Sequence, residues 1–97
     1  MATVHGTMNV SSAEANLRTQ NMADFEGWTL VESGMDELVF KKGVSRRSWG
    51  SRLTVAFDAS SPTETRVTIW VEDTVSAFGR DGRAARRLLD LLGAVEN

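Results

Sequence analysis

The side chains best suited to binding a partner are cations and tryptophans near the middle of the chain. Residues 41–52 hold five cations and no acid, and an alternating strand pattern follows them directly. On the outer face of a sheet, such cations interleaved with aromatic rings could stack bases and contact phosphates. The candidate ligand-binding residues are Arg46, Arg47, Trp49, Arg52, Arg66 and Trp70.

The distribution of charge argues against a general affinity for nucleic acid. Residues 1–40 carry six acids against one arginine, and the whole chain of 97 residues has a net charge of −2. A protein that neutralises several phosphates is normally more basic than this. Pairing of the outward side chains with their cross-strand neighbours is the simpler interpretation of the same residues. Nucleic-acid binding therefore stays an alternative to binding of a partner or ligand that the sequence does not identify.

A second candidate site precedes the last predicted helix. Residues 79–83 (GRDGR) offer two glycines and two arginines where backbone N–H groups and the helix dipole can hold an anion. The segment matches neither the P-loop nor the dinucleotide-binding fingerprint. A helix start capped by Asp81, with arginines on its solvated side, is the competing interpretation. The candidate anion-binding residues are Gly79, Arg80, Gly82 and Arg83.

The residue types present give little support to a catalytic or metal-binding function. The chain has no cysteine and a single histidine, His5, predicted on the outer face of a strand, so no thiol nucleophile and no histidine-activated hydroxyl is expected. Neighbouring acids such as Asp36 and Glu37 lack calcium-loop spacing. Glu32 is a marginal exception, because alternation with Trp28 turns it inward at a strand end, but a frayed, exposed glutamate is the favoured interpretation. We predict a non-enzymatic protein without metal or cofactor.

A small hydrophobic ligand held between helix and sheet is a further alternative. Such a pocket would be lined by Trp28, Phe40, Phe57 and Leu88. Against it, a domain of this length has few core residues to spare for an empty cavity.

The elements that position these residues follow from periodicity. Ser11 and Glu14 have capping-box spacing, which predicts a helix over residues 12–25 that ends at Gly27. A final helix, ending at Gly93, is indicated by an apolar stripe with helical spacing. The stripe residues are Ala84, Ala85, Leu88, Leu91 and Leu92. Alternation predicts strands over residues 3–10, 28–31, 37–42, 52–57 and 66–72, with a hairpin connection at 59–63.

The order β-α-β-β-β-β-α predicts an α+β fold. We expect one domain, residues 1–97, with a mostly antiparallel five-stranded sheet and both helices on one face, in a TBP-like or reduced helix-grip arrangement. The final helix must lie across the inner sheet face, because no other surface can accept its leucines. A free strand edge or Trp70 could support a homodimer or a protein partner. The chain lacks a signal-peptide pattern and an apolar run of ~20 residues, so a cytoplasmic protein without membrane contact is expected.

Four short motifs resemble those of a group of small bacterial α+β domains whose activity is unknown. They are Gly27-Trp28, Ser48-Trp49-Gly50, Thr65-Arg66-Val67 and Phe78-Gly79-Arg80 ahead of Leu88-Leu89. The likeness spans residues 3–92, although the segment after Phe78 departs from the pattern. The resemblance implies a fold, with Ser48-Trp49-Gly50 marking the start of the fourth strand. It implies no catalytic residue.

Overall fold

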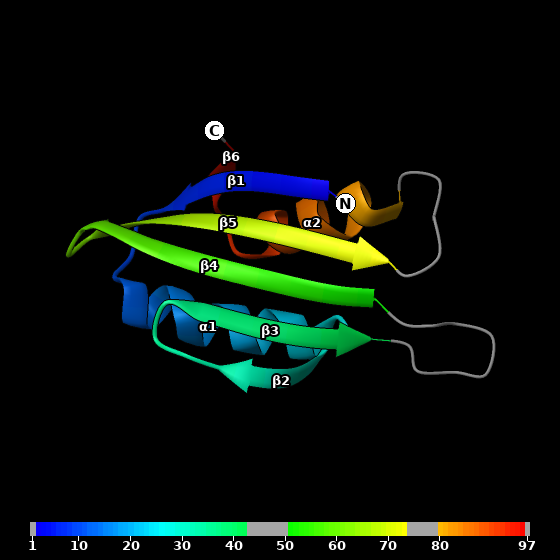
Figure 1. The fold of residues 1–97 in the computed structure, drawn as a ribbon. Coiled ribbons are helices and arrows are strands. Elements are labelled where there is room, and N and C mark those ends of the chain that lie inside the picture. The colour runs from blue at the N-terminus through cyan, green and yellow to red at the C-terminus, as the bar shows by residue number, and fades with distance from the viewer. Residues whose placement is uncertain (1, 43–50, 74–79, 97) are drawn as a thin grey trace.

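The fold is a single antiparallel sheet with two helices packed on one face (Figure 1). The computed structural model describes residues 2–42, 51–73 and 80–96. The elements are β1 (Ala2–Met8), α1 (Ser12–Phe25), β2 (Thr29–Ser33), β3 (Glu37–Lys42), β4 (Ser51–Ser61), β5 (Glu64–Asp73), α2 (Arg80–Leu91) and β6 (Val95–Glu96). The predicted α+β class and the order β-α-β-β-β-β-α are confirmed. The two-residue strand β6 was not predicted.

The strands are arranged in the order β2-β3-β4-β5-β1-β6, and every neighbouring pair is antiparallel. The first strand therefore lies beside the fifth, and β2 and β6 form the two edges. Helix α1 packs on β2 to β5, whereas α2 packs on β1 and β5. In Figure 1 both helices lie behind the sheet, so the described residues place no helix over its other face.

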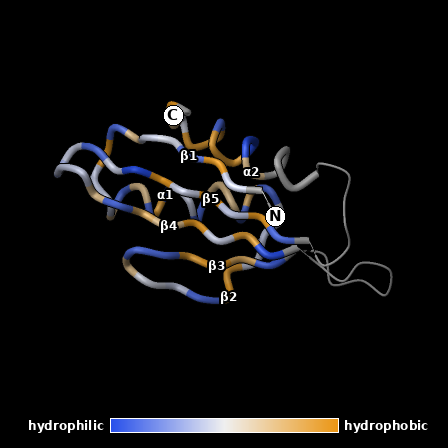
Figure 2. Tube along the Cα trace, turned by 45° about the horizontal axis from the view of Figure 1, so that its top comes forward, coloured by the Kyte–Doolittle hydropathy of each residue, from blue (hydrophilic) through white to orange (hydrophobic). Residues whose placement is uncertain are grey.

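Alternating side chains build the core between the sheet and the helices. The alternate residues of β3, β4 and β5 that belong to the core are all buried: Leu38, Phe40, Leu53, Val55, Phe57, Val67, Ile69 and Val71. The alternation of hydrophobic and hydrophilic residues along the strands can be followed in Figure 2. Because side chains alternate between the two faces of a strand, the sequence pattern alone decides which of them meet the helices.

Helix α1 lies close to the sheet because its inner face is made of small residues. Ala15, Thr19 and Ala23 are fully buried and follow each other at intervals of four. The Thr19 hydroxyl donates a 2.7 Å hydrogen bond to the Ala15 carbonyl, so its burial leaves no polar group unpaired. The larger apolar residues Leu17 and Phe25 point to solvent. This explains the weak apolar stripe of the sequence, since the stripe that packs is made of alanine and threonine.

The predicted ends of α1 are confirmed by its capping contacts. The Ser11 hydroxyl accepts a hydrogen bond from the Glu14 N–H at 3.3 Å, as in a capping box. At the other end the chain leaves the helix through Gly27, whose φ is 87°. The Gly27 N–H donates to the Asp24 carbonyl at 3.0 Å, and the Trp28 N–H donates to the Ala23 carbonyl at 2.9 Å. This pair of bonds is a Schellman motif, which folds the chain back so that Trp28 is buried beside the helix.

Helix α2 covers β1 with a slightly different stripe from the predicted one. Ala85, Leu88, Leu89 and Leu92 are buried, while Leu91 is only half-buried. The reason is Gly6 on β1: a Cβ built there would lie 2.6 Å from Cδ1 of Leu89, so the missing side chain makes the space that Leu89 fills. The side chain of Ala84 lies outside the described residues.

Two local features differ from the predictions. Residues Leu30 and Glu32 of β2 pair with Phe40 and Val39, so a β-bulge at Val31 interrupts the alternation. The bulge places Glu32 on the face of Val39, opposite the helices, where it is exposed, as the favoured interpretation of the sequence has it. Helix α2 begins at Arg80, so Asp81 lies in its first turn and does not precede it.

An ion pair between described residues joins the two helices. The Arg87 guanidinium donates a hydrogen bond to the carboxylate of Glu26, the C-cap residue of α1. This hydrogen bond, together with the negative charge of Glu26, raises the pKa of Arg87. Because Arg87 is solvent-exposed, we expect Arg87→Ala to lower the melting temperature by at most a few degrees, with the loss shrinking at high salt. Thermal melts at two salt concentrations measure this. A large, salt-independent loss would show that Arg87 packs instead of pairing.

Candidate functional site

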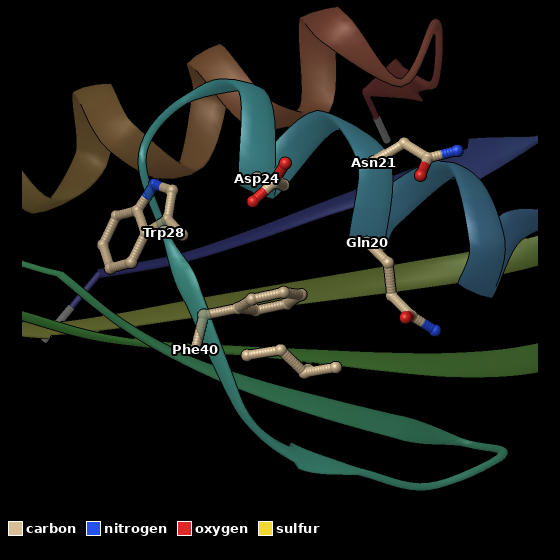
Figure 3. A pocket seen from close by; sticks show the side chains of 6 residues that line it. Gln20, Asn21, Asp24, Trp28 and Phe40 are labelled. Atoms are coloured by element: carbon tan, nitrogen blue, oxygen red, sulfur yellow. The ribbon is translucent and has the colours of Figure 1, made fainter.

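A pocket of about 260 Å³ opens between α1 and the β2–β3 hairpin (Figure 3). Ligand pockets for drug-sized molecules usually measure roughly 300–1,000 Å³. This one therefore suits a single ring or a short chain. The helix contributes Gln20, Asn21 and Asp24, and the opposite wall consists of Trp28, Leu30 and Phe40.

Local chain geometry places the two aromatic residues, Trp28 and Phe40, at the wall of the pocket. Trp28 follows the Schellman turn of α1, and Phe40 is an inward residue of β3. Their side chains are 6% and 1% exposed, so the pocket meets rings that are already anchored in the core. Leu30, the register partner of Phe40 on the edge strand, is 38% exposed and forms the outer wall.

The polar wall follows from the helical repeat. Asn16, Gln20 and Asp24 succeed each other at intervals of four on the side of α1 that faces the hairpin. Asn16 donates to the carbonyls of Gly34 and Met35 at 3.0 and 3.3 Å, which ties the hairpin turn to the helix. Gln20 in turn donates to the Asn16 side chain at 2.7 Å. In Figure 3 Gln20 extends from the helix toward the sheet, and Asp24 lies between Gln20 and Trp28 in this view.

The pocket considered as an alternative from the sequence is not the pocket observed. Of its four expected lining residues, only Trp28 and Phe40 line the observed pocket. Phe57 and Leu88 do not, because both are packed into the core between the sheet and the helices. Sequence reasoning missed Gln20, Asn21 and Asp24, although their helical spacing was a usable signal. It also did not foresee that β2 would be an edge strand, which places Leu30 at the rim of the pocket.

The outer sheet face carries three of the predicted ligand-binding residues, at separate places. Arg52 lies in register with Glu72 and Lys41, and Arg66 lies in register with Asp58 and Thr7. Each arginine therefore has a carboxylate opposite it on a neighbouring strand. Trp70, half-buried, lies between Thr54 and Thr3 in the same register. His5 is exposed on this face, as predicted, with Nδ1 3.2 Å from the Thr68 hydroxyl.

The remaining predicted site residues are less completely described. Arg46, Arg47 and Trp49, with the rest of the Ser48-Trp49-Gly50 motif, lie outside the described residues, and so does Gly79. Arg80, Gly82 and Arg83 belong to the first turn of α2, but the side chains of the two arginines lie outside the described part of the structure. The basic loop and the anion site therefore stay predictions.

The part of the chain that the structure describes offers no metal site. It contains no group of three or more histidine and acidic side chains placed to hold a metal ion. Within the same ranges, neither helix combines the length and apolarity needed to cross a bilayer.

Comparisons with known proteins identify no family. No protein-family model matches the chain, and no curated protein matches it. Among solved structures, TTHA0849 from Thermus thermophilus is 11% identical, with a TM-score of 0.44 over 94% of this chain and 92% of that one. Ara h 8.0201 is 7% identical, with a TM-score of 0.45 over 94% and 93%. At TM-scores below 0.5 neither likeness carries an inference, and the resemblance to bacterial domains of unknown activity stays a prediction.

Proposed function

We propose that this protein is a non-enzymatic binding module whose site is the pocket between α1 and the β2–β3 hairpin. Its ligand would be a small molecule, or a single side chain of a partner, with a mostly apolar body. The observation that carries the proposal is a concave surface with buried aromatic rings at one wall and polar helix side chains at the other. Apolar walls with a few placed polar groups are the usual composition of ligand sites.

The pocket is held open by contacts that do not involve a ligand. The hydrogen bonds from Asn16 fix the hairpin turn against α1, and the Schellman turn fixes Trp28. A site that is already formed loses little conformational entropy when it binds. Binding is also the chemistry that its polar side chains allow, since one carboxylate and two amides provide no nucleophile–base pair.

The outer sheet face supports the nucleic-acid alternative poorly. Arg52 and Arg66 each lie opposite a carboxylate, so the described part of that face offers little net positive charge to a phosphate backbone. The cytoplasmic location remains a prediction from the sequence.

The proposed function is tested by binding of small ring compounds, followed through backbone amide signals in NMR. We expect the amides of residues 20–24, 28–30 and 40 to shift. Leu30→Gln should weaken binding about tenfold, the effect of losing about 1.4 kcal/mol of apolar contact.

The matched control is Val31→Gln. Val31 neighbours Leu30 on the same edge strand and is 46% exposed, but it does not line the pocket. Its substitution should leave the affinity unchanged. Shifts confined to the outer sheet face, or equal losses in the two variants, would contradict the proposal.

A further inference from the structure

We propose that the pocket selects an organic cation, in which an ammonium group is joined to an apolar ring or chain. This inference rests on the proposed function and adds the chemical class of the ligand. It follows from the charges at the pocket and not from the volume.

The first observation is an unneutralised carboxylate on the pocket wall. The three acids of α1 and its cap are Glu14, Asp24 and Glu26. Glu14 pairs with Arg18 at 3.0 Å, and Glu26 pairs with Arg87. Asp24 is exposed and lines the pocket, and within the described ranges no cation pairs with it. Among the described side chains, it is thus the acid of this helix that has no cationic partner.

The second observation is the position of Asp24 along the helix. Asp24 lies in the last turn of α1, where the helix dipole places partial negative charge, and this turn contains no basic residue. An acid at this end is unfavourable for the helix, and a cation there is favourable. A positive group bound beside Asp24 would interact with both the carboxylate and the helix terminus, and a negative group would be repelled by both.

The third observation is the composition of the remaining walls. Trp28 and Phe40 line the pocket with rings that are only 6% and 1% exposed, and these rings offer apolar contact to the body of a ligand. The side-chain carbonyl oxygens of Gln20 and Asn21 can accept hydrogen bonds from an ammonium group. Rings, acceptors and a carboxylate around one cavity fit a molecule with an apolar end and a cationic end.

The experiment compares three probes that share a ring and differ in charge: 2-phenylethylammonium, 2-phenylethanol and 3-phenylpropionate. Amide shifts in NMR report binding of each one to the native chain. We expect the cation to bind more tightly than the alcohol by a factor of roughly 1.4 to 5, the range for an exposed ion pair, and the anion to bind most weakly. The preference should decrease at high salt.

Asp24→Asn should abolish the preference for the cation while leaving the affinity for the alcohol unchanged. Asp36→Asn, which removes an exposed carboxylate outside the pocket lining, is the matched control and should keep the preference. Equal binding of cation and alcohol, or equal loss of all probes in Asp24→Asn, would overturn the inference and leave the proposed function standing. If none of the probes shifts the amide signals of the pocket residues, both the inference and the proposed function fail.

Discussion

Gly6→Ala is expected to lower the free energy of unfolding by about 1–3 kcal/mol, and Gly6→Val by more. Gly6 is buried on β1, and a Cβ there would lie 2.6, 3.1 and 3.2 Å from three side-chain carbons of Leu89. Leu89 is itself 1% exposed, so its side chain must move within the packed core. The added methyl must therefore displace Leu89, either by a change of its rotamer or by a shift of α2 away from β1. Since small domains are stable by only about 5–15 kcal/mol, urea unfolding resolves this loss easily.

A double-mutant cycle shows whether the loss arises from that contact. Leu89→Ala alone should cost about 2–5 kcal/mol, because it leaves a cavity. Combined with Gly6→Ala it should cost clearly less than the sum of the two, since the alanine methyl then occupies part of that cavity. His5→Ala, on the exposed face of the same strand, is the control and should change stability little. Additive losses would show that the strand, and not the helix contact, is sensitive to substitution.

Phe40→Ala is expected to destabilise the protein by about 3–5 kcal/mol. The Phe40 ring is 1% exposed, belongs to the core cluster and also forms a wall of the pocket. Its removal would join the pocket to a new cavity beneath α1. Urea unfolding of this variant measures the loss, and Phe40→Leu should recover a large part of it because leucine fills most of the space.

Leu30→Ala is the matched comparison, because Leu30 is the register partner of Phe40 and lines the same pocket. Because Leu30 is 38% exposed, Leu30→Ala should lower the free energy of unfolding by less than about 1 kcal/mol. The two lining residues then have different roles: Phe40 stabilises the fold, and Leu30 affects ligand binding with little effect on stability. Losses of equal size would mean that β2 is more deeply packed in solution.

Much of the fold could be predicted because its signals are local. Strict alternation in residues 53–57 and 67–71 identifies β4 and β5 and their buried faces, since the two sides of a strand are set by geometry alone. Ser11 and Gly27 mark the ends of α1, because each satisfies the backbone groups at a helix terminus within a few residues. These features need no knowledge of distant parts of the chain.

The features that the sequence did not reveal depend on contacts between distant segments. The β-bulge at Val31 is a property of pairing with β3. Leu89 replaces Leu91 in the packed stripe because Gly6, more than eighty residues away, leaves room for it. Strand β6 exists because the Schellman turn at Gly93 returns the chain to β1.

The candidate site shows the same division. Composition by itself determined the kinds of chemistry available: the chain has no thiol, a single imidazole, and cations that the acids of its first forty residues offset. Only the tertiary structure decided where a ligand could bind, because a pocket needs walls from elements that are far apart in sequence. Gln20 and Asp24 of α1 meet Leu30 and Phe40 of the hairpin because sheet pairing makes β2 an edge and small residues bring the helix close. Periodicity predicts which face of each element is buried, but the packing of these faces determines where a cavity remains.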